Sequence, residues 1–138
     1  MNTREDLETL LRRLLGTGRF EGFPRHPDHL DSILAVAASQ LHRRRPYGER
    51  EVNEALSEWL QSVNSPVDHV TLRRRMVDCG FLKRTTNGSR YFLNYGRVAG
   101  VLGDPALEVD AGVIIDDLQR EREERKRASM EQSPQPVE

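Results

Sequence analysis

The sequence predicts a mainly α-helical protein with a small β-hairpin, in which one helical domain carries an added helix at each end. Apolar residues recur at helical spacing in several segments that Gly and Pro separate. Two short strand-like runs enclose the pair Asn87-Gly88, which is typical of hairpin turns. A chain of 138 residues, 36% hydrophobic and 31% charged, can bury one modest core but not two. We therefore expect one domain with appendages.

The first expected helix spans residues 4–15 and has one apolar stripe. Thr3 can cap its start, and Gly16 and Gly18 end it. The stripe consists of leucines at i, i+3, i+4, i+7 and i+8: Leu7, Leu10, Leu11, Leu14 and Leu15. We expect the stripe to pack on the domain that follows. The alternative is a homodimer formed through Leu7, Leu10, Leu11 and Leu14.

Three core helices are expected at residues 29–42, 49–60 and 66–79. Pro46 and Gly48 separate the first from the second, and Tyr47 between them suits a very short strand. The third helix has Asp68 near its start and ends at Gly80, where a left-handed residue is favoured. The first two helices carry these apolar residues: Leu30, Ile33, Leu34, Val36, Ala37 and Leu41, then Val52, Leu56, Trp59 and Leu60.

The third core helix has two distinct faces. At about 100° per residue, one face is apolar: Leu72, Met76 and Cys79. The opposite sector is polar: Thr71, Arg74, Arg75 and Asp78. Arg73 falls between apolar positions, so we expect it to have a structural role.

A hairpin and a charged extension follow. The strand-like runs are residues 81–84 and 89–93. Beyond Asn94 we expect a loop until about Val113, then a solvated helix with pairs such as Asp116 with Arg120, Glu121 with Arg125 and Glu123 with Arg127. We divide the chain into residues 1–22 (helix and linker), 23–97 (core domain), 98–130 (extension) and 131–138 (a disordered tail).

The order of three helices that run directly into a hairpin is typical of a winged helix-turn-helix domain. The sequence also resembles an uncharacterised bacterial family, a domain of unknown function found alone or fused to helix-turn-helix regulators. The match covers about residues 23–92 and rests on Phe23-Pro24, Tyr47 with residues 49–54, Asp68 with residues 71–74, residues 77–82 and residues 88–91. It implies a winged-helix-like fold and a regulatory setting. The chain departs from the family pattern because no Lys/Arg run follows Phe23-Pro24.

The charge is distributed unevenly along the chain. Residues 42–97 carry eleven Lys or Arg and six Asp or Glu, a net +5, and residues 98–138 carry five and ten, a net −5. A basic segment is the expected footprint of a surface that binds a polyanion. The acidic segment suggests a hypothesis in which it competes with DNA for the basic surface.

We expect a DNA-binding module that acts as a transcriptional regulator and has double-stranded DNA as its partner. Its third core helix would enter the major groove with Thr71, Arg74 and Arg75 at bases and phosphates. Six further cations would neutralise phosphates: Lys83, Arg84, Arg90, Arg43, Arg44 and Arg45. The structural alternative is that these cations are solvated or pair with Glu49, Glu51, Glu54 and Glu58.

A second function class remains open, because the same fold also serves as a protein–protein adaptor. In that case the partner is a protein of the transcription machinery and DNA is not bound directly. The acidic extension favours this alternative.

Enzymes, metal sites and membrane spans are not expected. The single cysteine, Cys79, allows no internal disulfide, and no glycine-rich phosphate loop or nucleophile elbow is present. His26, Asp28 and His29 lack a second Cys/His cluster that would complete a zinc site, so neither a metal nor a cofactor is expected. The chain has no apolar run near 18 residues and no signal-peptide pattern at its start. We therefore expect a cytoplasmic protein.

Overall fold

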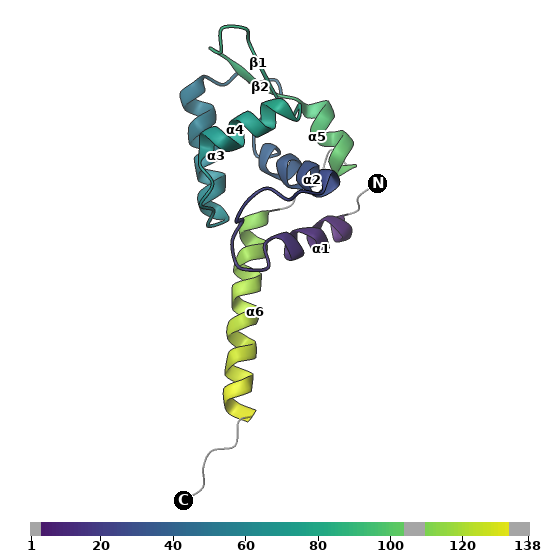
Figure 1. Ribbon diagram of the computed structural model, residues 1–138, viewed down its shortest axis with the longest axis vertical. Coiled ribbons are helices and arrows are strands. Elements are labelled where there is room, and N and C mark those ends of the chain that lie inside the picture. The colour runs from purple at the N-terminus through teal and green to yellow at the C-terminus, as the bar shows by residue number, and fades with distance from the viewer. Residues whose placement is uncertain (1–3, 104–109, 133–138) are drawn as a thin grey trace, which may run out of the picture.

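The computed structural model describes residues 4–103 and 110–132, and this part is mainly helical with one two-stranded antiparallel sheet (Figure 1). The predicted fold class, mainly α with a small β-hairpin, is confirmed. The elements in chain order are α1 (Arg4–Leu14), α2 (Pro27–Ala38), α3 (Glu49–Ser62), α4 (His69–Asp78), β1 (Leu82–Arg84), β2 (Tyr91–Leu93), α5 (Tyr95–Leu102) and α6 (Ala111–Gln132).

Helix α2 forms the centre of the body, with α3 and α4 on one side and α5 on the other (Figure 1). Every residue from Ser32 to Ala38 is buried, as a helix with apolar side chains on several faces requires. The helix begins at Pro27, two residues before the predicted start, because proline suits the first helical position and the imidazole of His26 accepts a hydrogen bond from the Asp28 N–H. It ends at Ala38, four residues before the predicted end.

The hairpin places Leu82 opposite Leu93 and Lys83 opposite Phe92. The short strand expected at Tyr47 is confirmed as a single antiparallel bridge, in which its N–H and C=O both bond to Tyr91, at 2.9 and 2.8 Å. The sheet order is therefore β1, β2, Tyr47.

The connection between the strands is wider than a two-residue Asn-Gly turn. Thr85 and Arg90 close it through a 3.0 Å backbone hydrogen bond, and Gly88 has a φ of +70°. The Asn87 side chain accepts hydrogen bonds from the Ser89 N–H and hydroxyl, so it stabilises the loop from within.

The loop predicted between Asn94 and Val113 is wrong for its first part, because residues 95–102 form α5. Val98 and Leu102, one turn apart, are buried, and α5 packs on α2. Glycines at 96, 100 and 103 weaken the helical pattern in the sequence, but tertiary packing outweighs that propensity. The predicted boundary between residues 97 and 98 therefore falls inside a helix.

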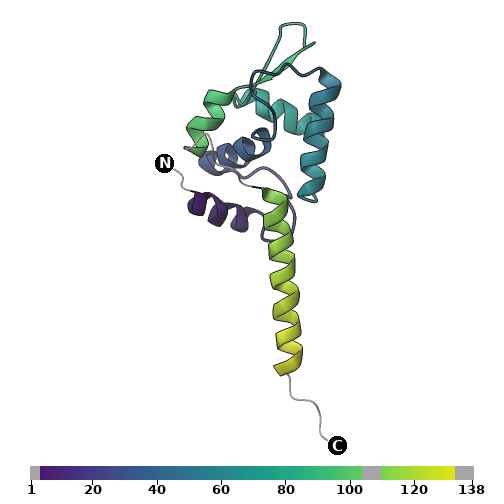
Figure 2. The ribbon, with the colours of Figure 1, turned by 180° about the vertical axis from the view of Figure 1, so that it is seen from behind.

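Helix α1 is confirmed and lies across the start of α6 (Figures 1 and 2). Leu7, Leu11 and Leu15 are buried within the chain, so the stripe packs on its own domain. Two of the four leucines considered for a homodimer are therefore covered already, and Leu10 and Leu14 are half-buried.

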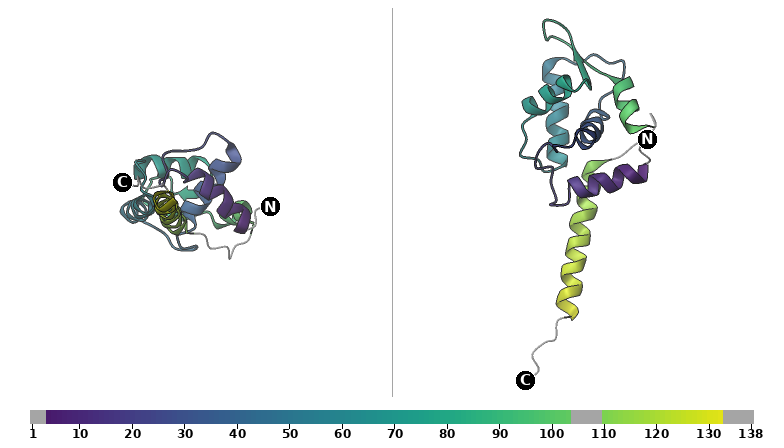
Figure 3. Two further views of the ribbon diagram at one scale, coloured as in Figure 1. Left: turned by 90° about the horizontal axis from the view of Figure 1, so that it is seen from below. Right: turned by 45° about the vertical axis from the view of Figure 1, so that its right-hand side comes forward.

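Helix α6 begins at Ala111 and extends away from the body at the end opposite the hairpin (Figures 1, 2 and 3). Only its first turns are buried, at Ala111, Ile114 and Ile115. It continues to Gln132, so the prediction of disorder is wrong for residues 131 and 132, and the rest of that segment lies outside the described residues.

The ion pairs of α6 differ from those expected. Arg120 pairs with Asp117, and Glu121 pairs with Arg12 of α1, while the Arg122 guanidinium donates to the Gly16 carbonyl at 2.7 Å. The predicted partners of both residues are therefore wrong: Arg120 pairs one turn away with Asp117 in place of Asp116, and α1 supplies the cation for Glu121 from outside the helix. No helix among the described residues combines the length and apolar character needed to cross a membrane.

Candidate functional site

Helix α4 presents the polar face that its sequence predicts. Leu72 and Met76 are fully buried, and the exposed residues are Thr71, Arg74, Arg75 and Asp78. Asp68 caps the helix, because its carboxylate accepts hydrogen bonds from the Thr71 N–H at 2.9 Å and the Thr71 hydroxyl at 3.1 Å. The backbone bond from Thr71 is the main reason why the pKa of Asp68 lies below its usual value.

The three residues predicted to face DNA bases differ in their surroundings. Arg74 is exposed and has no ion-pair or hydrogen-bond partner among the described residues. The guanidinium of Arg75 lies 4.8 Å from the centre of the Phe23 ring, a cation–π contact that orients it. The Thr71 hydroxyl already donates to Asp68, so it is less available as a donor to an outside group.

Arg73 has the structural role that its position between apolar residues predicts. Its side chain is 13% exposed, lies 3.4 Å from a Glu49 carboxylate oxygen and donates to the Asn53 side-chain carbonyl. Its guanidinium also lies 5.6 Å from the centre of the Tyr91 ring. Arg73 therefore joins α4 to α3 and to β2.

The hairpin carries three exposed cations. Lys83 and Arg84 belong to β1, and Arg90 precedes β2. Within residues 4–103 and 110–132 none of the three side chains has a hydrogen-bond or ion-pair partner. Helix α4 packs on β1, so the helix and the hairpin lie next to each other in the upper part of Figure 1.

The arginines of residues 43–45 are not equivalent. Arg43 lies 3.9 Å from the centre of the Tyr95 ring of α5. Arg45 forms a 2.7 Å ion pair with Glu51. Arg44 is exposed in a left-handed conformation, with a φ of +63°, and has no partner in the described part of the chain. Of these three predicted phosphate contacts, Arg44 alone has no ion pair, hydrogen bond or cation–π contact within the described residues.

Three glutamates of α3 form ion pairs with arginines. Glu49 pairs with Arg73, Glu51 with Arg45, and Glu54 with Arg50 at 3.4 Å. The pKa of Glu51 is lowered mainly by the hydrogen bond that it accepts from the Gly48 N–H, and also by Arg45. These pairs leave the positive charge of Arg74, Lys83 and Arg84 without a bonded carboxylate.

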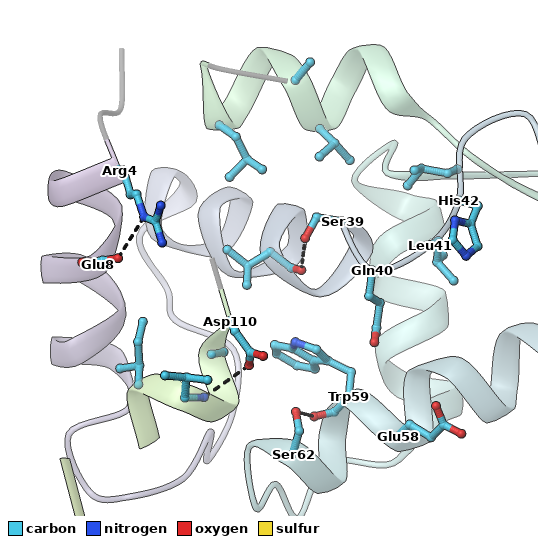
Figure 4. Close-up of a pocket in the computed structure, with 18 of the residues that line it drawn as sticks. Arg4, Glu8, Ser39, Gln40, Leu41, His42, Glu58, Trp59, Ser62 and Asp110 are labelled. Atoms are coloured by element: carbon cyan, nitrogen blue, oxygen red, sulfur yellow. Dashed lines mark hydrogen bonds and ion pairs between the residues drawn. The ribbon is translucent and has the colours of Figure 1, made fainter. Parts of the chain in front are cut away.

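A cavity of about 900 Å³ lies among α1, α2, α3, α5 and α6. Figure 4 shows the Trp59 indole projecting between Asp110 and Gln40. Much of its polar lining is committed: Arg4 pairs with Glu8 at 3.2 Å, the Ser62 hydroxyl donates to the Trp59 carbonyl at 2.6 Å, and Asp110 accepts from the Gly112 N–H at 2.9 Å. The lining also includes Gln40, His42 and Glu58, so it mixes polar groups that are bonded within the fold with others that are not bonded among the described residues.

The described residues contain no group of three His, Cys, Asp or Glu side chains placed to hold a metal ion. His26 and His29 stack with ring centres 4.3 Å apart, and His26 caps α2. Cys79 is half-buried, and this burial raises the pKa of its thiol.

Two features of the surface escaped the sequence reasoning. The cavity depends on α5 and α6, whose packing no local pattern reveals. Phe92 is 37% exposed and lies opposite Lys83. Strand alternation was a usable signal for Phe92, because Tyr91 beside it is buried.

A family model of bacterial proteins matches residues 19–93, which is more than half of the chain. The family is described as "Uncharacterized protein conserved in bacteria (DUF2087)". The chain belongs to this family. The match confirms the predicted resemblance over residues 23–92. The DUF2087 segment contains α2, α3, α4 and the hairpin, whereas α1, α5 and α6 lie outside it. No curated protein and no solved structure matches the chain.

Proposed function

We propose that this protein is a DNA-binding winged-helix module that regulates transcription. One observation carries the proposal. Four exposed cations that form no hydrogen bond or ion pair among the described residues lie on α4 and the hairpin, which are the elements a winged helix uses on DNA: Arg74, Lys83, Arg84 and Arg90. The neighbouring Arg73 and Arg45 are bound to carboxylates within the fold.

The winged-helix assignment draws support from the strand order. A helix, the Tyr47 bridge, two more helices and a hairpin follow one another along the chain. Tyr47 belongs to the segment that connects α2 to α3, and it pairs with β2. The hairpin is therefore joined to this connecting segment through a small sheet. In this arrangement α4 would enter the major groove, and the hairpin would follow the backbone.

The residues would act unequally in such a complex. Arg74 is the strongest candidate for a base or phosphate contact, because an arginine can form two parallel hydrogen bonds with guanine. Arg75 would reach the backbone from its position on Phe23. Lys83, Arg84, Arg90 and Arg44 would neutralise phosphates and make the binding steeply dependent on salt.

The alternative function is that of a protein adaptor in a transcription complex. It is favoured by α6, whose exposed and charged residues after Arg122 project from the body. An adaptor needs no affinity for DNA, so a binding measurement separates the two functions.

The test is a titration of the full chain against a labelled duplex of mixed sequence at two salt concentrations. We expect affinity to fall steeply with salt, and Arg74→Ala to weaken binding about five- to tenfold and to reduce the salt slope by about one. Arg127→Ala is the matched control, because Arg127 is an exposed arginine on the far part of α6. Absence of binding at low salt would reject DNA as the partner and leave the adaptor.

A further inference from the structure

Phe92 lies on the outer face of the hairpin, beside the cations Lys83 and Arg90. Lys83 is its direct cross-strand partner. Arg90 is two residues earlier in the chain and directly precedes β2; it is exposed, and its charge also contributes to the lowered pKa of Glu51. Phe92 is 37% exposed, and it is the one aromatic among the large apolar side chains found exposed in residues 4–103 and 110–132.

The fold covers part of Phe92 but holds its ring by no aromatic contact among the described residues. Tyr91, on the inner face, is buried, pairs with Tyr47 and lies under Arg73. Phe92 has no aromatic or cation–π contact within the described part of the chain. A single exposed apolar residue is ordinary on a protein surface, but the two flanking cations give this ring a distinct chemistry.

An aromatic ring between cations suits a nucleic-acid strand with unpaired bases. A base can stack on the ring while the cations contact the phosphates on either side. In an intact duplex the base faces are covered by neighbouring pairs, so only an unpaired base can stack in this way.

We propose that the outer face of the hairpin, formed by Lys83, Arg90 and Phe92, binds an unpaired stretch of a nucleic-acid strand. This inference rests on the proposed function, because it places the unpaired stretch beside duplex DNA that α4 holds. The preferred substrate is then a junction between duplex and single strand.

The test compares three labelled probes at one salt concentration: a blunt duplex, the same duplex with a ten-nucleotide single-stranded tail, and the tail strand alone. We expect the tailed duplex to bind about five- to tenfold more tightly than the blunt duplex, which corresponds to one stacked base. Phe92→Leu removes the ring but keeps an apolar side chain, so it should abolish this gain and leave affinity for the blunt duplex unchanged. Phe92→Tyr should retain the gain. Thermal unfolding of each variant checks that the exposed substitution leaves the fold intact.

The outcomes separate this inference from the proposed function. Equal affinity for the tailed and blunt duplexes, or a gain that Phe92→Leu retains, overturns the inference and leaves duplex binding standing. Binding of the tail strand without the blunt duplex, with sensitivity to Phe92→Leu, rejects the proposed function and supports a single-strand site on the hairpin. Absence of binding to all three probes overturns both.

Discussion

Arg97 of α5 forms an ion pair with Asp31 of α2, with 3.1 Å between Nη2 and Oδ1. The same guanidinium donates from Nε to the Cys79 carbonyl at 3.2 Å and lies 4.7 Å from the centre of the Phe81 ring. One side chain from outside the matched segment therefore holds α5 against α2 and against the junction of α4 and β1. Helix α5 is part of the body rather than of an extension.

Replacement of Arg97 by methionine should destabilise the protein. The Arg97→Met variant keeps an apolar stem but loses the ion pair and the bond to Cys79, so we expect the free energy of unfolding to fall by about 1–3 kcal/mol. Chemical denaturation measures it, with Arg127→Met as the control on the exposed part of α6. In a double-mutant cycle with Asp31→Asn the two effects should be less than additive. Full additivity would mean that the Arg97–Asp31 pair contributes nothing.

Two glycine substitutions should have opposite effects. Gly80 follows α4 with a φ of +84°, so Gly80→Ala should cost about 1–2 kcal/mol of stability through backbone strain. Gly100 is exposed within α5, and an added Cβ would meet nothing within 4 Å. Gly100→Ala should therefore stabilise the protein by about 0.5–1 kcal/mol. Thermal unfolding of both variants tests the pair, and a Gly80→Ala variant as stable as the wild type would contradict the assigned conformation.

The adjacent arginines of α4 should separate stability from binding. Arg73→Ala removes a largely buried guanidinium that joins α3, α4 and β2, so we expect a loss of about 1–3 kcal/mol in the free energy of unfolding. Arg74→Ala removes an exposed side chain and should change stability by less than about 0.5 kcal/mol. Urea denaturation of both variants measures the difference. Equal losses would mean that Arg73 contributes no more to the free energy of unfolding than the exposed Arg74.

The Asp68 cap should make α4 sensitive to acid. Because the folded state lowers the pKa of Asp68, chiefly through the Thr71 N–H, the charged cap stabilises the protein above the carboxyl pKa of the unfolded chain, about 3.9. This contribution disappears as the pH falls through the lower pKa of the folded state. Asp68→Asn keeps a capping oxygen without the charge. We expect the wild type to have the higher unfolding midpoint at pH 7 and the difference to shrink as the pH falls from about 3.9 through the lower pKa of the folded state. A difference that stays constant over this range would exclude a role for the charge.

Removal of residues 123–138 should leave the affinity for DNA unchanged. Helix α6 leaves the body at the end opposite the hairpin (Figures 1 and 2), so its far part is poorly placed to compete for the basic surface. A cut after Arg122 keeps the buried Ile114 and Ile115 and the Arg12–Glu121 pair, which a cut at residue 113 would destroy. Duplex titration compares the truncated and full chains. Residues 123–138 carry four Glu against three Lys or Arg, a net −1, so the cut removes a small part of the −5 of residues 98–138. Binding several-fold tighter after truncation would contradict the expectation and support a competing role for this part of the segment.

The sequence by itself determined the features that depend on neighbours along the chain. The leucine stripe of α1, the two faces of α4, the glycine after its end and the paired strands all follow from periodicity and turn chemistry. These patterns show which face of an element is apolar, and the fold must bury that face because apolar surface in contact with water costs free energy.

Only the tertiary structure decided which charges remain available. Arg44 and Arg45 are adjacent and chemically identical, yet Arg45 pairs with Glu51 and Arg44 faces solvent. Helix α5 likewise forms because α2 offers it an apolar partner, despite its glycines. Such outcomes depend on which elements meet in space, and local spacing carries no information about contacts between distant residues.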